Sequence, residues 1–267
     1  MSNSKGQKIE LTKAKLSAIK QLLQKKYREE EGKFLLEGWK TVEEALNANV
    51  EIDTVVYDEQ KVPNKQIIPR LHKASKEMFT AKAKEIDALS DAVTSQGIIA
   101  VLPKLSAMHR LAEIMKSQSA VVVAVESIND PGNLGTIIRT CDWFGADALV
   151  ISKNSVELYN PKVVRATMGS LFHLPIIDDT DLIAFLKKCR NEGFAIYSTA
   201  LANSDDIRKV VWDKKSVVVI GSESHGVSSE IIQLADHRIM IPKYGKAESL
   251  NAAMACGIVL SQIKLRQ

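Results

Sequence analysis

The sequence predicts an α/β protein whose second half forms a mostly parallel sheet flanked by helices. From Ser119 onward, short runs rich in valine and isoleucine alternate with amphipathic stretches, a pattern typical of βαβ units. The runs at 120–125 (AVVVAV) and 216–220 (SVVVI) lack polar alternation, so they fit strands buried on both faces of a sheet. A chain of 267 residues also has room for a second domain.

The residues before Ser119 predict this second domain, a small α/β unit of about one hundred residues. Apolar residues recur at helical spacing between Ile9 and Leu23, Gly38 marks a turn, and Pro103 ends the last strand. We expect helices at 9–23, 39–48 and 85–93, a mixture of Pro-bounded turns and a helix at 61–75, a short apolar run at 34–36, and strands at 52–59 and 95–103.

The stretch that follows predicts a connecting helix, because its apolar residues lie on one helical side. We therefore divide the chain into a domain over 1–104, a connecting helix over 105–118 and a domain over 119–267. In the last domain we expect strands at 120–126, 148–152, 174–178, 194–200, 216–223 and 237–242, and helices at 134–144, 163–171, 181–193, 228–235 and 250–265.

Composition favours a reducing compartment, and we expect the cytoplasm. No apolar run approaches the ~20 residues that a membrane-spanning helix needs, and the N-terminus lacks the apolar core of a signal peptide. Cys141, Cys189 and Cys256 are widely separated and form no CxxC pair, which argues against disulfides or a zinc site. We expect all three to be small core residues. No HExxH motif or histidine spacing indicates a metal.

Basic residues concentrate near the N-terminus, although the net charge of the chain is only +4. The first forty residues contain ten lysines and arginines against five glutamates. Such a segment can contact the phosphates of a nucleic acid, and a solvated helix face explains it nearly as well. The ten residues are Lys5, Lys8, Lys13, Lys15, Lys20, Lys25, Lys26, Arg28, Lys33 and Lys40.

Three loops of the second half predict a single binding site. They are NDPGNLGTIIR at 129–139, GSESHG at 221–226 and IPKYGKAESLN at 241–251, and each follows an expected strand. Their Gly, Pro, Asn, Ser and Glu residues let backbone groups approach a ligand closely. Ligands of open α/β sheets bind beyond the carboxyl ends of the strands, where such loops converge.

The helix after the first loop is expected to present an arginine away from the sheet. By the 3.6-residue period, one stripe carries Leu134, Ile138 and Cys141, and the opposite stripe carries Thr136, Arg139 and Trp143. A guanidinium near the start of a helix can bind a phosphate or a carboxylate. A solvated or ion-paired surface arginine is the simpler alternative.

The other two loops carry polar side chains with two interpretations each. Glu223 and His225 are close enough for acid/base chemistry, and turn formation explains both residues almost as well. Ser249 is expected to cap the last helix, with Asn251 in its first turn, where an asparagine amide is available for another role. Neither a GxGxxG nor a GxxxxGK[ST] motif occurs, which disfavours a dinucleotide-binding oxidoreductase and a P-loop protein.

Together and in this order, the stretches NDPGNLGTIIRTCDWFGAD, VVVIGSESHGVS and IPKYGKAESLNAAMACGIVL resemble the three signature motifs of the SpoU/TrmH family. These proteins are RNA ribose 2′-O-methyltransferases that use S-adenosylmethionine, and the resemblance covers Ser119 to Gln267. The first half, with FLLEGWKTVEEAL and SQGIIAVL, resembles the small substrate-binding domain of many members, which is similar to ribosomal proteins. The resemblance implies a C-terminal trefoil knot, a homodimer and an RNA partner.

The resemblance also assigns roles to residues by their positions in the motifs. It implies that Arg139 is the catalytic residue, that Asn133 and Ser249 orient the ribose and Arg139, and that Glu223 and Asn251 hold the loops together. Gly221, Ile241 and Leu250 are the expected cofactor contacts, with Thr199 and Ala200 as further candidates. His225 falls at a variable position, and Ala252, Ala253 and Met254 replace a more usual β-branched triplet.

The two-domain layout favours large-subunit ribosomal RNA as the substrate. Transfer RNA is the alternative substrate, and a methyltransferase that protects ribosomal RNA from an antibiotic shares the layout. A catalytically silent RNA-binding or assembly protein is the alternative from another class, and the intact polar motif positions speak against it.

Overall fold

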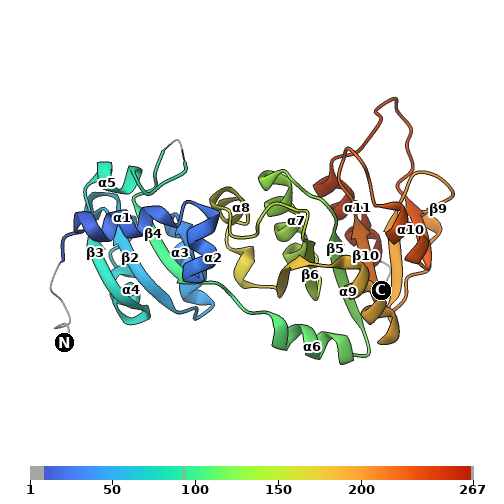
Figure 1. Cartoon of the computed structure of the whole chain (residues 1–267), viewed down its shortest axis with the longest axis horizontal. Coiled ribbons are helices and arrows are strands. Elements are labelled where there is room, and N and C mark those ends of the chain that lie inside the picture. Colours follow the sequence, from blue (N-terminus) through green and yellow to red (C-terminus); the bar gives the residue numbers. More distant parts are fainter. Residues whose placement is uncertain (1–8, 93, 266–267) are drawn as a thin grey trace. The chain divides into compact units, whose positions relative to one another are not determined.

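The structure, a computed structural model, describes residues 9–92 and 94–265. The chain divides into two compact units (Figure 1). Unit 1 holds the described residues of Met1–Leu105 together with Tyr159–Phe172, and unit 2 holds those of Ser106–Leu158 and His173–Gln267. In the described ranges, no helix is both long and apolar enough for a membrane span.

Unit 1 is built on a mixed four-stranded sheet with the order β1-β4-β2-β3. β2 and β3 are parallel, whereas β4 is antiparallel to β1 and to β2. The strands are β1 (Lys33–Glu37), β2 (Ile52–Tyr57), β3 (Ser75–Thr80) and β4 (Ile98–Pro103). The helices are α1 (Lys13–Gln21), α2 (Lys25–Glu31), α3 (Trp39–Asn47), α4 (Ile67–Ala74), α5 (Ala83–Asp87) and α8 (Pro161–Ala166), with short 3-10 turns η1 (Glu59–Lys61) and η2 (Ser170–Phe172).

The segment Tyr159–Phe172 joins unit 1 although it comes from the middle of the second half of the chain. The rings of Tyr159 and Phe34 lie 4.6 Å apart, and the Tyr159 hydroxyl accepts a hydrogen bond of 2.8 Å from the Leu105 amide. Arg165 of α8 forms an ion pair with the buried end of β1, at 3.5 Å from Glu37. Side chains of α8 thus complete the packing of β1.

Unit 2 contains a seven-stranded sheet with the order β7-β6-β5-β10-β8-β11-β9, and every described pairing in it is parallel. This result confirms the mostly parallel sheet predicted from the sequence. The strands are β5 (Ala120–Val125), β6 (Ala148–Ser152), β7 (Ile176–Thr180), β8 (Ala195–Thr199), β9 (Asp205–Asp206), β10 (Lys215–Ile220) and β11 (His237–Met240). The helices are α6 (Met108–Lys116), α7 (Pro131–Trp143), α9 (Leu182–Asn191), α10 (Ser229–Leu234) and α11 (Ala252–Lys264), with the 3-10 turn η3 (Ile207–Lys209).

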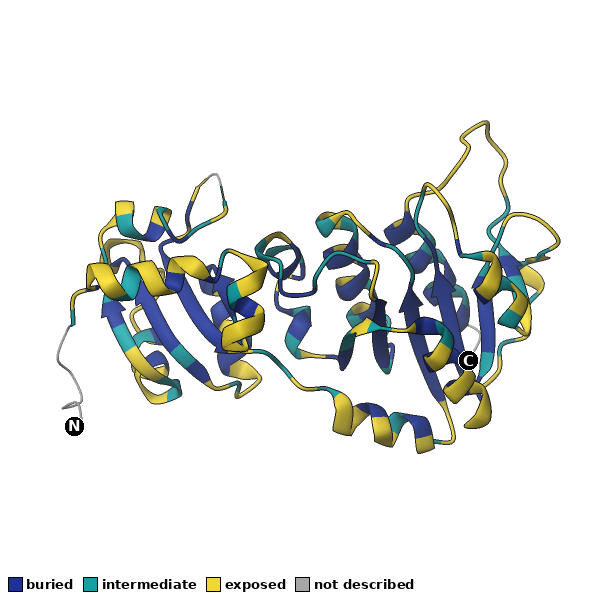
Figure 2. Cartoon of the chain, in the orientation of Figure 1, coloured by how far each residue is buried: buried dark blue, intermediate teal, exposed yellow. Residues whose placement is uncertain are grey.

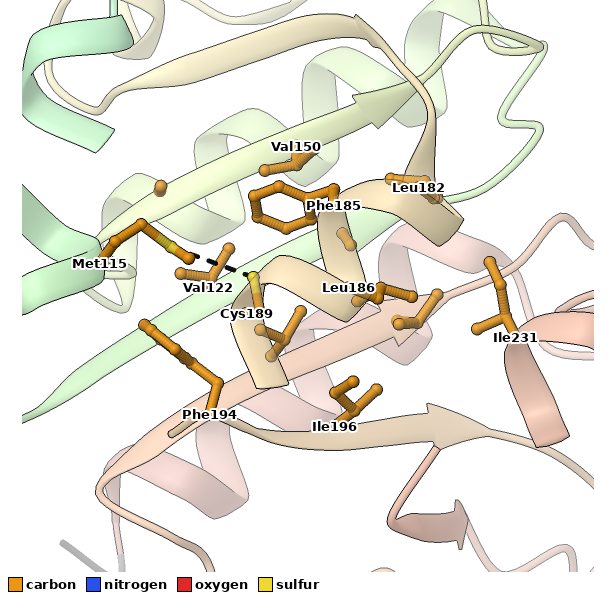
Figure 3. Close-up of a cluster of buried hydrophobic side chains, with 14 of the residues drawn as sticks. Met115, Val122, Val150, Leu182, Phe185, Leu186, Cys189, Phe194, Ile196 and Ile231 are labelled. Atoms are coloured by element: carbon orange, nitrogen blue, oxygen red, sulfur yellow. Dashed lines mark hydrogen bonds between the residues drawn. The ribbon is translucent and has the colours of Figure 1, made fainter. Parts of the chain in front are cut away.

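Helices cover both faces of this sheet, and the strands between them are buried (Figure 2). On one face, α6, α9 and α10 enclose an apolar cluster that includes Met115, Phe185, Leu186 and Ile231 (Figure 3). On the other face, α11 packs against α7, and the two helices contact β10 and β6. Burial on both faces explains the unbroken valine and isoleucine runs.

All three cysteines are buried free thiols, which confirms their predicted place in the core. Cys189 lies against Met115 with its Sγ 4.0 Å from the thioether sulfur (Figure 3), and burial raises the pKa of this thiol to about 12. A hydrogen bond with Cys256 and burial hold the pKa of Cys141 well above its usual range. A thiol with so high a pKa stays protonated and unreactive.

β3 was not predicted, and β1 was expected only as a short apolar run. β3 lies at the edge of its sheet, and its sequence SKEMFT exposes Lys76 and Glu77. Edge strands commonly carry charged side chains, which prevent pairing with other chains and hide the apolar pattern of a strand. The helix expected at 85–93 is also shorter than predicted, because α5 ends at Asp87, and Val93 lies outside the described residues.

The N-terminal basic residues divide into paired and free side chains. Arg28 is buried, and its Nη1 donates a hydrogen bond of 2.8 Å to the Leu22 carbonyl. Lysines of this segment also form ion pairs. Lys15 pairs with Glu77, and Lys33 Nζ lies 2.7 Å from the Asp53 carboxylate. Lys5 and Lys8 lie outside the described residues. The guanidinium of Arg28 is therefore occupied inside the unit, and only the exposed lysines of this segment remain for the open question of phosphate contact.

Candidate active site

The three motif loops leave the same edge of the unit 2 sheet. β5, β10, β8 and β11 are consecutive neighbours and run in parallel, so their carboxyl ends lie side by side (Figure 1). The loop before α7 follows β5, the turn at 221–226 follows β10, and the long loop at 241–251 follows β11. The predicted convergence of these loops is confirmed.

The first loop ends in a well-capped helix start. Asp130 is the N-cap of α7, and its carboxylate Oδ1 accepts a hydrogen bond of 2.7 Å from the Asn133 amide. Pro131 occupies the first helical turn, where the missing amide proton costs no hydrogen bond. This local geometry fixes the backbone of Asn133 and leaves its side-chain amide free to contact the other loops.

Glu223 connects all three loops through one carboxylate oxygen. Its Oε1 accepts hydrogen bonds from Asn133 Nδ2 at 2.6 Å, from Asn251 Nδ2 at 3.3 Å and from the Ala252 backbone amide at 3.1 Å. The two asparagines also bond directly, with Asn251 Nδ2 donating to Asn133 Oδ1 at 2.9 Å. The structure thus brings Asn133, Glu223 and Asn251 together as a polar cluster.

The N-cap of the last helix is Asn251, so the prediction that Ser249 caps it is wrong. Asn251 Oδ1 accepts hydrogen bonds from the Ala253 and Met254 amides at 3.0 and 3.2 Å. The helix therefore starts two residues later than predicted, at Ala252. Ser249 is exposed and makes no hydrogen bond in the part of the chain that the structure describes. Asparagine is as good an N-cap as serine, and here it also reaches Glu223.

Removing the Glu223 carboxylate is expected to destabilise unit 2. Glu223→Ala leaves three donors without their acceptor, so we expect a loss of about 2 kcal/mol in unfolding free energy. Glu223→Gln keeps one acceptor oxygen and should lose less. The matched control is Glu248→Ala, because Glu248 is exposed and has no ion pair among the described residues. Thermal melting tests this prediction, and equal midpoints for Glu223→Ala and Glu248→Ala would contradict it.

The turn that carries Glu223 closes on a glycine. The Gly226 amide donates a hydrogen bond of 2.8 Å to the Ser222 carbonyl, so the chain reverses between these residues. A Cβ atom on Gly221 would lie 2.0 Å from the Gly226 carbonyl carbon. Only glycine fits there, which gives Gly221 a structural reason beside its predicted cofactor contact.

Arg139 lies on the exposed face of α7, as predicted from the helical period. Leu134, Ile138 and Cys141 are fully buried, whereas the opposite stripe is exposed. Arg139 makes no hydrogen bond or ion pair within 9–92 and 94–265. Arg139 follows Asn133 by fewer than two turns of α7, and among the described residues no hydrogen bond joins it to the polar cluster. The charge of Arg139 is therefore available to a ligand.

The remaining predicted cofactor contacts lie at the same edge of the sheet. Thr199 ends β8, and its hydroxyl donates to the Val219 carbonyl at 3.1 Å, while the Ala200 amide donates to the Ile239 carbonyl at 3.0 Å. Ile241 is half-buried, and Leu250 is 45% exposed. Among described residues, the backbone groups of 241–250 make no hydrogen bond, so they can contact a ligand.

Sequence analysis missed a fourth connection, between the ends of β5 and α10. Glu126 follows β5 directly, and its Oε2 accepts a hydrogen bond of 2.8 Å from the Ser228 amide. Ser228 is in turn the N-cap of α10. The acidic residue immediately after the buried run AVVVAV was the signal for this contact. His225, by contrast, is exposed, and its amide donates to Ser222 Oγ at 3.3 Å.

Known proteins match both halves of this chain. The sequence pattern of the MRM3-like substrate binding domain matches residues 13–100. A Bacillus subtilis protein named 23S rRNA (guanosine(2553)-2′-O)-methyltransferase RlmP is 30% identical over 253 residues, which cover 94% of this chain and 96% of the relative. An uncharacterized tRNA/rRNA methyltransferase of Synechocystis is 28% identical over 93% of this chain and 90% of its own length.

The likeness extends to solved structures. The crystal structure of an AdoMet-bound rRNA methyltransferase from Sinorhizobium meliloti superimposes with a TM-score of 0.85, at 31% identity and with 96% of each chain covered. The sequence pattern of the SpoU rRNA methylase family matches residues 120–261, which contain the three motif loops and the polar cluster. The chain belongs to the SpoU rRNA methylase family.

Proposed function

We propose that this protein transfers the methyl group of S-adenosylmethionine to a ribose 2′-hydroxyl of ribosomal RNA, at the carboxyl edge of the unit 2 sheet. The observation that carries the proposal is the polar cluster of Asn133, Glu223 and Asn251. It joins the three motif loops of the family in one place. The relatives with names that state an activity are methyltransferases, and one solved relative contains the cofactor.

The residues at this edge fit the cofactor. S-adenosylmethionine has an adenine ring that favours apolar surface and polar groups that favour backbone donors and acceptors. Leu250 and Ile241 supply partly exposed apolar surface, and the unpaired backbone of 241–250 supplies donors and acceptors. Thr199, Ala200 and Gly221 end or follow the neighbouring strands β8 and β10. When bound, the cofactor supplies a methyl group on a positively charged sulfur.

Arg139 is the proposed catalytic residue. A ribose hydroxyl becomes a good nucleophile as its proton is lost, and a nearby positive charge stabilises the resulting alkoxide. A guanidinium keeps its proton at physiological pH because its usual pKa exceeds about 12. Arg139 therefore acts through its field and by binding the target phosphate. Asn133 and Ser249 would orient the ribose, while Glu223 and Asn251 hold the loops that carry them.

Large-subunit ribosomal RNA is the proposed substrate. The substrate-binding pattern at 13–100 and the name of the Bacillus subtilis relative support this choice over transfer RNA. An antibiotic-resistance role has the same chemistry and differs only in the nucleotide methylated. A silent RNA-binding protein would have no need for an exposed Arg139, unpaired among the described residues, on the helix that carries Asn133 of an intact polar cluster.

Mapping of 2′-O-methylated nucleotides tests the proposal. Ribosomal RNA from a strain that lacks this protein should lose one 2′-O-methyl group, and purified protein with the cofactor should restore it in vitro. The substrate assignment would be wrong if ribosomal RNA from the deleted strain kept all its 2′-O-methyl groups and the purified protein methylated transfer RNA instead.

Free lysines on α1 are expected to contribute to RNA binding. Lys13 and Lys20 are exposed and make no hydrogen bond or ion pair among the described residues. Replacing both with glutamine should weaken RNA binding. The slope of log affinity against log salt concentration should also become shallower, by the amount expected for the loss of up to about two phosphate contacts. The control replaces Lys25 and Lys26, which already pair with Glu29 and Glu30. Binding measured at several salt concentrations tests this, and equal slopes for parent and Lys13/Lys20 variant would contradict it.

The knot, the homodimer and the cytoplasmic location also belong to this proposal. α11 returns from the β11 side of the sheet to pack against α7, which supports a threaded C-terminal segment. Trp143 of α7 is 85% exposed and Met254 of α11 is 59% exposed, and large exposed apolar side chains support a dimer contact. Three free thiols support a reducing compartment.

A further inference from the structure

An exposed aromatic ring, Tyr244, lies in the loop between β11 and α11, and the chemistry above does not use it. The residue is 83% exposed, and most of the loop around it is exposed as well (Figure 2). Burial of an aromatic ring is favourable by several kcal/mol at most sites, so a ring held in solvent suggests a binding surface.

The ring is fixed by its hydroxyl. Arg208 Nη1 donates a hydrogen bond of 2.8 Å to the Tyr244 hydroxyl, and the guanidinium carbon lies 6.0 Å from the ring centroid. Arg208 is itself held by Asp206, because its Nε lies 3.0 Å from both carboxylate oxygens. Hydrogen bonds from Arg208 lower the pKa of Asp206 to about 2, so this ion pair persists at physiological pH.

Arg208, which anchors the ring, and Tyr244 both lie at the carboxyl edge of the sheet. Asp206 of β9 pairs with Met240 of β11 in a parallel arrangement. The turn η3 and the loop at 241–251 follow directly, so both start at the same edge of the sheet. The same loop ends at Asn251, a member of the polar cluster. The anchored ring thus belongs to the loop that carries the proposed ribose site.

The loop that carries the ring is basic, with two lysines against the single carboxylate of Glu248. Arg208 and Lys209 follow β9, and Lys243 and Lys246 flank the ring in its own loop. Lys243 and Lys246 are exposed and have no hydrogen bond or ion pair in the described ranges. Exposed aromatic rings among cationic side chains bind single-stranded nucleic acids, since bases stack on the ring and phosphates meet the cations.

We infer that Tyr244 stacks on a base of the RNA substrate close to the ribose that is methylated, and that Arg208 positions the ring for this contact. The inference rests on the proposed function and adds a determinant of substrate binding to it. The occupant is an unpaired base rather than a duplex, because a paired base presents no free face to a protein side chain.

The test compares Tyr244→Ala, Tyr244→Trp and Tyr244→Phe on in-vitro-transcribed large-subunit ribosomal RNA. Loss of one base–aromatic stack should raise the KM and the Kd for RNA about tenfold in Tyr244→Ala. Tyr244→Trp keeps a stacking ring and should bind RNA nearly as the parent does. Tyr244→Phe and Arg208→Gln each remove the anchor, so both should give intermediate losses. Arg208→Gln should add little in the Tyr244→Ala background, where no ring is left to position.

Calorimetry with S-adenosylmethionine and thermal melting separate this role from a structural one, and both should be unchanged in Tyr244→Ala. The control is Val211→Ala, because Val211 is 88% exposed and lies before the amino end of β10. An unchanged RNA Kd in Tyr244→Ala, or a weakened cofactor affinity, would overturn the inference. Failure of the parent to methylate the RNA would instead overturn the proposed function, while filter binding still measures the stacking contact.

Discussion

Arg139→Ala should lower kcat for methyl transfer by about 10²- to 10³-fold, the loss typical when one electrostatic stabiliser of a transition state is removed. Arg139 is exposed, so the fold loses no internal contact, and we expect the thermal midpoint to be unchanged. Because none of the proposed cofactor contacts lies on α7, calorimetry should show an unchanged Kd for S-adenosylmethionine. Arg139→Lys should recover only part of the rate, because lysine lacks the planar fork that binds a phosphate through two hydrogen bonds.

The matched control for Arg139 is Arg110→Ala. Arg110 lies on α6 in the same unit, and it is also exposed and without a hydrogen bond or ion pair in the described chain. Arg110 differs from Arg139 in location, because α6 covers the face of the sheet opposite to the one that α7 covers. Equal turnover in Arg139→Ala and the parent would refute the catalytic role. An equal loss in both variants would point to bulk charge instead of a positioned guanidinium.

The fold of unit 2 could be predicted well because its signals are local and strong. A valine and isoleucine run buried on both faces can be predicted as a strand from its own residues, without knowing which strands pair with it. The stripe of Leu134, Ile138 and Cys141 likewise follows from the helical period alone. β3 was missed because it lies at the edge of its sheet, where the exposed Lys76 and Glu77 interrupt the apolar pattern of a strand. The place of Tyr159–Phe172 in unit 1 had no local signal, since it depends on contacts with Phe34 and Glu37 far away in the sequence.

The site could be predicted as a set of residues but not as a geometry. The bond between Asn133 and Asn251 spans 118 residues, and that between Asn133 and Glu223 spans 90. The periodicities of helices and strands relate only residues a few positions apart, so they could not group these residues. Only the resemblance to a family assigned these particular residues to one site. The resemblance was silent on the cap of α11, where a propensity argument favoured Ser249 and the bond to Glu223 favours Asn251. Tertiary contacts decided between two residues with equal local preference.

Gly221→Ala should give the largest loss of stability among single-residue changes in these loops. Its Cβ would lie 2.0 and 2.2 Å from the carbonyl carbon and oxygen of Gly226 and 2.3 Å from the Val227 nitrogen. All three are backbone atoms, so no side-chain rotation relieves the clash, and the bond between the Gly226 amide and the Ser222 carbonyl must open. We expect a loss of about 3 kcal/mol in unfolding free energy. For a unit of this size, the melting midpoint should fall by about 6–12 °C.

Gly245→Ala is the matched control, because no atom lies within 4 Å of the Cβ that it would add. Alanine there restricts the unfolded chain, so the variant should melt at the same temperature as the parent or slightly above it. The opened turn in Gly221→Ala also moves Glu223 away from Asn133 and Asn251, so methyl transfer should fall together with stability. Equal melting midpoints for the two alanine variants would show that the turn tolerates a side chain, and the structural reason for Gly221 would be wrong. Its predicted contact with the cofactor would then be the remaining explanation for any loss of activity.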